Sequence, residues 1–356
     1  MATASISLPP TEQSDSLPVP HSRSARYDVL RVIACLAVIL LHLAATIVME
    51  RDLFGTLHWH ISNALDAATR WCVPVFVMLS GALLLDPQKY AGHRAFWVRR
   101  MSRLLPALIA WPTIYFAWRA FYWHEPLSLE IIARDMALGR PYIHLYFLFL
   151  IAGLYLVTPF LAKALATFSL SQLRDLILIM AGLAMGANLF DFLASSAFTI
   201  FVPYLTYYLA GWYCARLRIE QPSRLAVTIM LAATVTTLLT AILVSTRGYD
   251  DRWAFYFYED FSPTDMVMAV GLFLLILQGT ISPKVESIAQ TLAPLTLGVY
   301  VAHPIVVELL RYSYFLAVPI LLRPPYYVPV TLLLTCAITF SLVALMQQVP
   351  GLRRIV

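Results

Sequence analysis

The chain has 356 residues, of which 60% are hydrophobic and 13% are charged, and its mean hydropathy is +0.74. Soluble globular domains carry about 25% charged residues, so this composition excludes an ordinary soluble protein. The formal net charge is +5. The basic residues lie at the edges of apolar segments and form no exposed stripe, which argues against nucleic acid as a partner.

Long apolar segments repeat along almost the whole chain. An α-helix needs about 20 mostly apolar residues to cross the hydrocarbon core of a bilayer. We therefore predict an all-α fold, a polytopic transmembrane helical bundle of about ten spans in contact with the lipid bilayer. The predicted spans are 27–49, 62–85, 103–123, 143–163, 175–192, 198–215, 225–246, 264–281, 293–312 and 328–349. A shorter apolar piece, 314–322, is predicted to be interfacial or re-entrant.

Both ends of the chain are predicted to lie outside the bundle. Residues 1–25 are rich in Ser, Pro and Thr and lack an apolar run, which is typical of a disordered cytosolic tail. Residues 351–356 are predicted to be a second cytosolic tail. The segment between them, 26–350, is predicted to be one transmembrane domain.

The distribution of Lys and Arg predicts the orientation. If the amino terminus lies inside, the inner segments hold 16 Lys and Arg residues and the outer segments hold 7. Cytosolic loops carry the excess of positive charge in membrane proteins. We therefore predict that both termini are cytosolic, which agrees with an even number of spans.

The four cysteines carry no metal or redox signature. Cys35, Cys72, Cys214 and Cys336 all fall within or at the edge of apolar segments, and their spacing matches no known ligand pattern. We interpret them as small core residues and predict no metal site.

The first predicted helix carries three polar side chains on one side. Arg31 and His42 are eleven residues apart, so their directions differ by about 20° and they are separated by roughly 16 Å along the axis. Asp28 lies one turn before Arg31. With the amino terminus inside, Arg31 lies near the cytosolic boundary and His42 lies in the outer half. A buried polar group in a membrane usually faces the bundle interior or a wet cavity.

Five stretches in a fixed order point to a family. Arg31 and His42 form an R-x10-H pattern, and the others are VPVFVMLSGALLL (73–85), FWVRRMSRLLP (96–106), HLYFLFLIAGLYLVTPFL (144–161) and TLGVYVAHPIVVELL (296–310). Together they resemble the motifs of acyltransferase family 3, the membrane-bound acyltransferases that modify surface glycans. The resemblance covers about residues 26–349. We single out the branch that O-acetylates enterobacterial common antigen as a similar one.

The resemblance implies a multi-pass enzyme of the bacterial inner membrane. Such an enzyme moves an acetyl or longer acyl group from cytosolic acetyl-CoA, or another acyl-CoA, to a hydroxyl of a surface glycan or a polyprenyl-linked sugar. Family members differ in the acceptor and in the acyl chain. The acceptor and the oligomeric state therefore stay open.

Basic residues at the start of the third predicted helix are candidates for binding the donor. Arg100 and Arg103 are three residues apart and share a helical face. Arginine forks suit phosphate oxygens, so we predict that they bind the phosphates of CoA, with Arg99 and Arg31 nearby. Asp28 is predicted to orient Arg31. The alternative is that these arginines only anchor the helix at the cytosolic side of the membrane. This alternative applies most to Arg99 and less to Arg100 and Arg103.

His42 is the predicted catalytic residue. An unperturbed imidazole titrates near 6.5, so it can take a hydroxyl proton at neutral pH. It can instead accept the acyl group itself and act as a carrier. The sequence does not choose between these two mechanisms, although the general base is our preferred one.

The ninth predicted span carries Tyr300, His303 and Glu308. His303 precedes Pro304, which is predicted to kink the helix and free backbone carbonyls. Glu308 and His303 are candidate catalytic residues, and Tyr300 is a candidate for binding the acceptor. The alternatives are an ion pair of Glu308 with Arg311, three residues later, and a histidine satisfied by packing.

The second predicted span carries Asn63, Asp66 and Arg70 on one face near its outer end. These residues are predicted to form either a wall that binds the acceptor or an internal ion pair.

Two other classes of function compete with the enzyme. Ten spans with buried His, Glu and Arg also suit a proton-coupled transporter of a small substrate. The two halves show no hydropathy symmetry that would indicate inverted repeats, however. The third possibility, an inactive relative that scaffolds partners, is disfavoured because Arg31, His42, Arg100 and Arg103 are all present.

Overall fold

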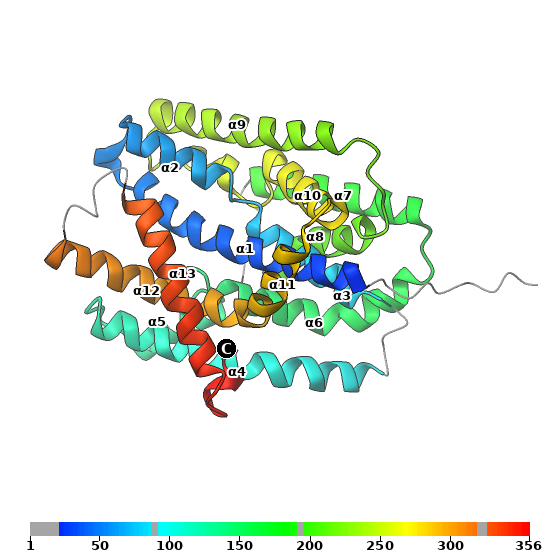
Figure 1. Cartoon of the computed structure of the whole chain (residues 1–356), viewed down its shortest axis with the longest axis horizontal. Coiled ribbons are helices and arrows are strands. Elements are labelled where there is room, and N and C mark those ends of the chain that lie inside the picture. Colours follow the sequence, from blue (N-terminus) through cyan, green and yellow to red (C-terminus); the bar gives the residue numbers. More distant parts are fainter. Residues whose placement is uncertain (1–20, 87–91, 191–195, 319–325) are drawn as a thin grey trace, which may run out of the picture.

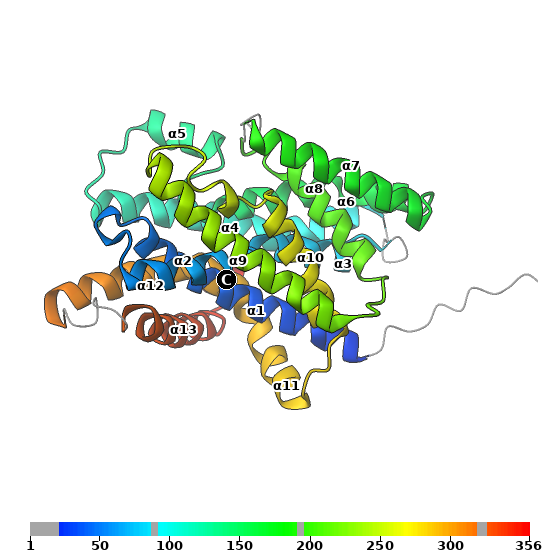
Figure 2. The ribbon, with the colours of Figure 1, turned by 90° about the horizontal axis from the view of Figure 1, so that it is seen from above.

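The computed structural model describes residues 21–86, 92–190, 196–318 and 326–356, and within these ranges every regular element is helical. Figures 1 and 2 show the helices packed side by side in one bundle. In chain order they are α1 (His21–Val48), α2 (Leu57–Ala67), α3 (Cys72–Leu84), α4 (His93–Phe121), α5 (Leu129–Ala137), α6 (Tyr146–Leu165), α7 (Leu170–Leu189), α8 (Phe201–Cys214), α9 (Pro222–Arg247), α10 (Pro263–Gln278), α11 (Pro283–Leu292), α12 (Thr296–Ala317) and α13 (Tyr327–Met346). Short 3-10 turns are η1 (Arg51–Leu53), η3 (Tyr256–Tyr258), η4 (Ala293–Leu295) and η6 (Leu352–Arg354).

Nine helical segments in the described ranges are long and apolar enough to cross a membrane. They correspond to nine of the ten predicted spans. The tenth, 198–215, is helix α8, which has only 14 residues. A helix of that length is about 21 Å long, shorter than the hydrocarbon core of about 30 Å. The predicted number of ten is therefore corrected to nine segments that meet the length requirement.

The second predicted span is not one continuous helix. Helix α2 ends at Ala67, and α3 begins at Cys72 after a turn over residues 68–71. Pro74 stands in the first turn of α3, where a missing N–H is tolerated. Because it cannot donate to the carbonyl of Arg70, the helical hydrogen-bond ladder is interrupted at this point. The break places Arg70 at the junction of two short helices inside the bundle.

The chain ends differ from the predicted tails. Helix α1 starts at His21, within the segment predicted as a tail, whereas residues 1–20 lie outside the described residues. At the other end, the indole N–H of Trp111 donates to the carbonyl of Ile355 at 2.7 Å. The last residues therefore pack against α4. Residues 314–317 continue α12, and the rest of the predicted interfacial piece, from 319 to 322, is not among the described residues.

Helix α1 lies at the centre of the bundle. It contacts α2, α3, α10, α11, α12 and α13, and Figures 1 and 2 show it running through the middle of the molecule. Its buried side includes Leu30, Cys35 and Leu43, each 0% exposed. A polar residue on α1 is therefore surrounded by several other helices.

The bundle has two chemically different ends. The amino-terminal parts of α1 and α4 lie together at one end, and the carboxyl-terminal parts of α1, α4 and α12 lie together at the other (Figure 1). We call the first the basic end, defined by Arg31, Arg99, Arg100 and Arg103. We call the second the cavity end, because the cavity described next lies there.

Candidate functional site

A cavity of about 970 Å³ lies at the cavity end. Its wall is formed by the last turns of α1 with the residues after it, the two residues that follow α4, the turn before α6, the second half of α12 and the start of α13. The lining is mostly apolar, with a few polar groups: His42, Glu50, Asp52, Glu308 and Arg311. Such a cavity, apolar with convergent polar groups, is typical of a small-molecule site.

Three histidine rings meet at the inner part of this cavity. The ring centroid of His42 lies 5.2 Å from that of His303 and 6.4 Å from that of His144, and the latter two are 5.6 Å apart. His303 is 0% exposed and His144 is 1% exposed, whereas His42 is half-buried and lines the cavity. We call these residues the histidine cluster. The predicted pair of His42 and His303 is thus brought together, with His144 as a third member.

Pro304 explains how His303 is held. Proline has no N–H, so the carbonyl of Tyr300, four residues earlier, receives no helical hydrogen bond from it. The Nδ1 of His303 lies 2.8 Å from this carbonyl oxygen and 3.3 Å from that of Val299. Because a carbonyl can only accept, Nδ1 carries the proton and donates it. The prediction that Pro304 frees a backbone carbonyl is therefore confirmed, and His303 uses that carbonyl.

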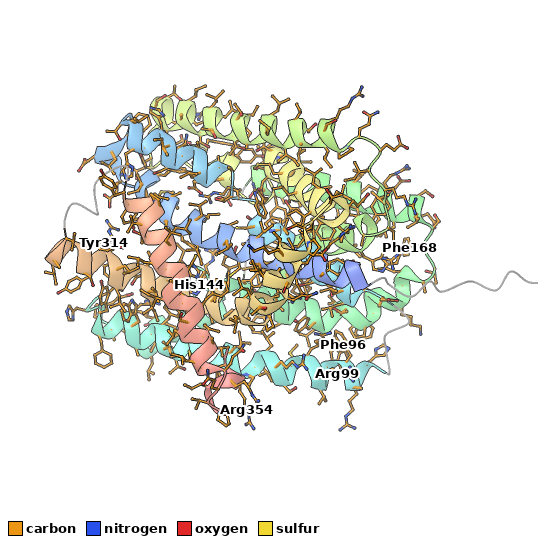
Figure 3. The ribbon with its side chains drawn as sticks, viewed as in Figure 1. Phe96, Arg99, His144, Phe168, Tyr314 and Arg354 are labelled. Atoms are coloured by element: carbon orange, nitrogen blue, oxygen red, sulfur yellow. The ribbon has the colours of Figure 1, made fainter. Side chains whose placement is uncertain are left out.

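His144 is held by two contacts with α12. It lies in the turn before α6, where its Nε2 donates to the carbonyl of Val301 at 3.2 Å. The hydroxyl of Tyr300 donates to the backbone carbonyl of His144 at 2.6 Å. Figure 3 shows His144 in the interior of the bundle. The predicted role of Tyr300 in binding the acceptor is therefore not what its contacts indicate: it positions His144 and does not line the cavity.

His144 has no predicted role, although the residue opens one of the motifs. A signal was present, because an ionisable side chain within a membrane-spanning segment is expensive and usually functional. His144 falls in the predicted span 143–163, as His42 and His303 fall in theirs. Comparing the three would have indicated a cluster.

Glu308 lies in the cavity wall and is held by aromatic donors. Its Oε2 accepts from the indole N–H groups of Trp118 at 2.6 Å and Trp123 at 3.2 Å, and its Oε1 accepts from the hydroxyl of Tyr142. Burial, together with the nearby Glu308 carboxylate, raises the pKa of the Tyr142 phenol, so this hydroxyl stays a donor at neutral pH. The alternative ion pair within α12 does not form, because Arg311 instead pairs with Glu50 at 2.8 Å.

The polar face of the second predicted span is internal. Asp66 is 0% exposed and pairs with Arg70 at 2.7 Å. Arg70 also lies 4.0 Å from the ring centroid of Tyr258. Asn63 donates to the carbonyl of Thr237 at 2.9 Å and accepts from the Tyr258 hydroxyl. None of the three lines the cavity, so of the two predicted alternatives the internal ion pair is what these contacts show.

At the basic end, α1 and α4 bring cations together near Tyr155 of α6. Arg31 of α1 and Arg100 and Arg103 of α4 all interact electrostatically with the hydroxyl of Tyr155 on α6. The guanidinium of Arg100 lies 6.0 Å from the ring centroid of Tyr155, and its Nε is buried without a hydrogen-bond partner. Arg103 is exposed. The predicted convergence of these three arginines is therefore present in the fold.

Asp28 and Arg99 are the other residues of the basic end that were predicted to help bind the donor. Asp28 pairs with Arg31 at 3.2 Å, and both side chains are partly exposed. Arg99 is exposed. Figure 3 shows Arg99 on the same side of His144 as Phe168 and far from Tyr314. Arg99 does not line the cavity.

Comparison with known proteins settles the family. A family model described as an acyltransferase domain matches residues 24–344, which is nearly the whole chain. The chain belongs to acyltransferase family 3. No curated protein and no solved structure gives a significant match to this chain. It is therefore a membrane acyltransferase with many membrane-spanning helices.

In this acyltransferase the basic end and the cavity are separated by packed side chains. The face of α1 that joins Arg31 to His42 carries Cys35 and Val38, which are 0% and 2% exposed. None of the residues that line the cavity belongs to the basic end. Any ligand that spans the two ends must therefore displace this layer.

Proposed function

We propose that this acyltransferase transfers an acetyl or longer acyl group from cytosolic acyl-CoA to a hydroxyl of a surface glycan or a lipid-linked sugar. The observation that carries the proposal is the position of His42. Its imidazole lines a cavity at one end of the bundle, and it lies on the same helix as Arg31, which joins Arg100 and Arg103 of α4 at the other end. One helix thus links a site for an anionic donor to a site for an acceptor.

The basic end suits the donor. Acyl-CoA carries phosphates, and arginine binds phosphate through paired N–H groups. Arg31, Arg100 and Arg103 converge there, and the buried Nε of Arg100 has a hydrogen-bonding capacity that no described residue uses. In this proposal the basic end and the amino terminus face the cytosol, and the enzyme resides in the bacterial inner membrane.

The cavity suits the acceptor. It is lined by aromatic and aliphatic side chains, and His42 is the group in it to which we assign the removal of a proton from a hydroxyl. Trp123 and Tyr312 are more than half exposed at its mouth and offer flat apolar faces for a sugar ring. The branch that acetylates enterobacterial common antigen provides the finer hypothesis for the acceptor.

The reaction requires the thioester carbon to reach His42. The roughly 16 Å along α1 is comparable with the length of an extended pantetheine arm. We propose that donor binding separates α1 from its neighbours at Cys35 and Val38, so that the arm enters between them. The acceptor hydroxyl then attacks the thioester, with His42 as general base, or His42 first carries the acyl group.

Donor binding can be tested by thermal unfolding of the full chain in detergent. A ligand that binds only the folded state raises the midpoint, by an amount that grows with its concentration. We expect acetyl-CoA to raise it, and Arg100→Ala with Arg103→Ala to abolish the shift. The matched control, Lys163→Ala with Arg224→Ala, removes two cations elsewhere and should keep it. No shift for the unmodified chain at millimolar acetyl-CoA would refute the donor assignment.

Catalysis can be tested with His42→Ala. We expect this variant to keep the acetyl-CoA shift and to lose transfer, measured by mass spectrometry of surface glycans from cells with the variant or the unmodified chain. Full acylation by the variant would remove His42 from the mechanism. The same comparison with cells that lack the chain identifies the acceptor.

A further inference from the structure

Two buried nitrogens of the histidine cluster have no partner. His303 donates from Nδ1 to the carbonyl of Tyr300, which leaves Nε2 as a lone pair. His144 donates from Nε2 to the carbonyl of Val301, which leaves Nδ1 as a lone pair. Both nitrogens are inaccessible to solvent and make no hydrogen bond. A buried polar atom without a partner costs free energy and needs an explanation.

Backbone carbonyls impose this arrangement. A carbonyl oxygen cannot donate, so each imidazole must turn its N–H to the carbonyl and its lone pair elsewhere. The two histidines use opposite nitrogens for this purpose. His303 turns Nδ1 to its own helix, and its Nε2 lies on the side of the ring away from that backbone. Helix α12 packs against α1, which carries His42.

The cluster is not arranged as a metal site. Among the residues that the structure describes, no group of three or more His, Cys, Asp or Glu side chains is placed to hold a metal ion. Arg70, which interacts electrostatically with His42, is itself paired with the carboxylate of Asp66. The two lone pairs are thus able to accept a hydrogen bond from an N–H group of a neighbouring side chain.

We propose that His303 Nε2 and His144 Nδ1 accept a hydrogen bond from His42 and so stabilise the imidazolium that forms when His42 takes the proton of the acceptor. This inference rests on the proposed function. His303 and His144 are positioning residues in it, because they act through His42 and touch no substrate. Nothing in the sequence motifs assigns them this task.

The acyl transfer moves one proton from the acceptor hydroxyl through His42 to the leaving thiolate. The acceptor oxygen forms a bond to the acyl carbon, the thioester C–S bond breaks, and the sulfur leaves as CoA thiolate. The hydroxyl proton passes to the bare nitrogen of His42. The other N–H of the resulting imidazolium donates to His303 Nε2 or His144 Nδ1, which stabilises the charge. The thiolate then takes one proton from the cluster, and all three imidazoles are neutral again.

Isosteric variants separate this role from a structural one. The amide of asparagine overlies Nδ1 of histidine, and the amide of glutamine overlies Nε2. His303→Gln keeps an acceptor at Nε2 and loses the donor to Tyr300, whereas His303→Asn does the reverse. For His144 the order is inverted, because His144→Asn keeps the acceptor at Nδ1 and His144→Gln keeps the donor to Val301.

The measurement is CoA release from acetyl-CoA by the full chain in detergent with added membrane glycolipid extract, as kcat and KM. We expect His303→Gln to exceed His303→Asn, and His144→Asn to exceed His144→Gln, each by about tenfold in kcat, the factor for one lost hydrogen bond. The KM for acetyl-CoA should not change. A role in holding the backbone alone predicts the opposite order for both residues and would overturn the inference.

A second measurement does not depend on activity. In the full chain labelled with 15N-histidine, NMR should show His303 protonated at Nδ1 and His144 protonated at Nε2 at neutral pH. The opposite tautomers, or two imidazolium rings, would overturn the inference. If the unmodified chain releases no CoA while these tautomers are observed, the proposed function fails and the lone-pair geometry stands.

Discussion

The close packing of α3 against α8 allows a stability prediction with a built-in control. A Cβ atom at Gly81 would lie 1.8 Å from the backbone oxygen of Tyr208, and one at Gly211 would lie 1.9 Å from the backbone oxygen of Met78. The two contacts are reciprocal, and both obstacles are main-chain atoms that no rotamer change can move. Small residues allow this approach of helices in membranes. We predict that Gly81→Ala and Gly211→Ala both destabilise the bundle.

The expected loss of unfolding free energy is the difference between two opposing effects. Real Cβ atoms essentially never lie closer than 3.0 Å to such a neighbour, so the two helices must separate by about 1.2 Å at Gly81. Overpacking of this kind costs about 1–3 kcal/mol, and rigid backbone on both sides places it in the upper half. Alanine regains up to about 1 kcal/mol of helix propensity. The expected net loss is therefore about 1–2 kcal/mol for each variant.

The assay is equilibrium unfolding in detergent, followed by tryptophan fluorescence. Gly182→Ala and Gly186→Ala on α7 are the controls, because an added Cβ meets nothing within 4 Å at either position. These should be neutral or stabilising by up to about 1 kcal/mol. The reasoning is refuted if the α3 and α8 variants are as stable as the α7 variants, because the close approach of the backbones would then not exist.

Three further outcomes are expected. Tyr300→Phe removes the hydrogen bond to the carbonyl of His144, so kcat should fall several-fold with an unchanged acetyl-CoA KM; a changed KM alone would contradict this. Arg70→Met leaves the buried carboxylate of Asp66 unpaired and should cost about 3–5 kcal/mol of unfolding free energy, of which Asp66→Leu in the same chain should restore a large part. Hydrogen bonds from the guanidinium of Arg119 lower the pKa of the Glu125 carboxyl below its usual value of about 4.3. The stability that this carboxylate adds is complete above its usual pKa and is lost as the pH falls through the lowered one. Hydrogen exchange in residues 122–141 should therefore rise only under acidic conditions, and a rise between pH 8 and 6 would contradict the assignment.

Much of the site was predictable because it depends on local rules. Apolar length indicates spans, so the helical bundle could be read from the sequence. The fixed rotation of a helix placed Arg31 and His42 on one face, and Pro304 predicted a free carbonyl. These statements need only the chain within one helix.

Contacts between side chains of different helices could be known only from the tertiary structure. Whether Glu308 pairs with Arg311 depends on whether Trp118, Trp123 and Tyr142 come close enough to compete for the carboxylate. These donors are more than 160 residues away in the chain, and no sequence period relates them. The same holds for the pairing of Arg311 with Glu50.

The sequence by itself determined that this is a helical membrane protein, that its family is acyltransferase family 3, and that Arg31 and His42 lie on one side of α1. Only the tertiary structure decided that His144 joins His42 and His303, that Arg70 serves an internal ion pair, and that α8 is too short to be a full span. The physical reason is that hydropathy and helix periodicity act along the chain. Which side chains satisfy each other's hydrogen bonds is decided by how separate helices pack.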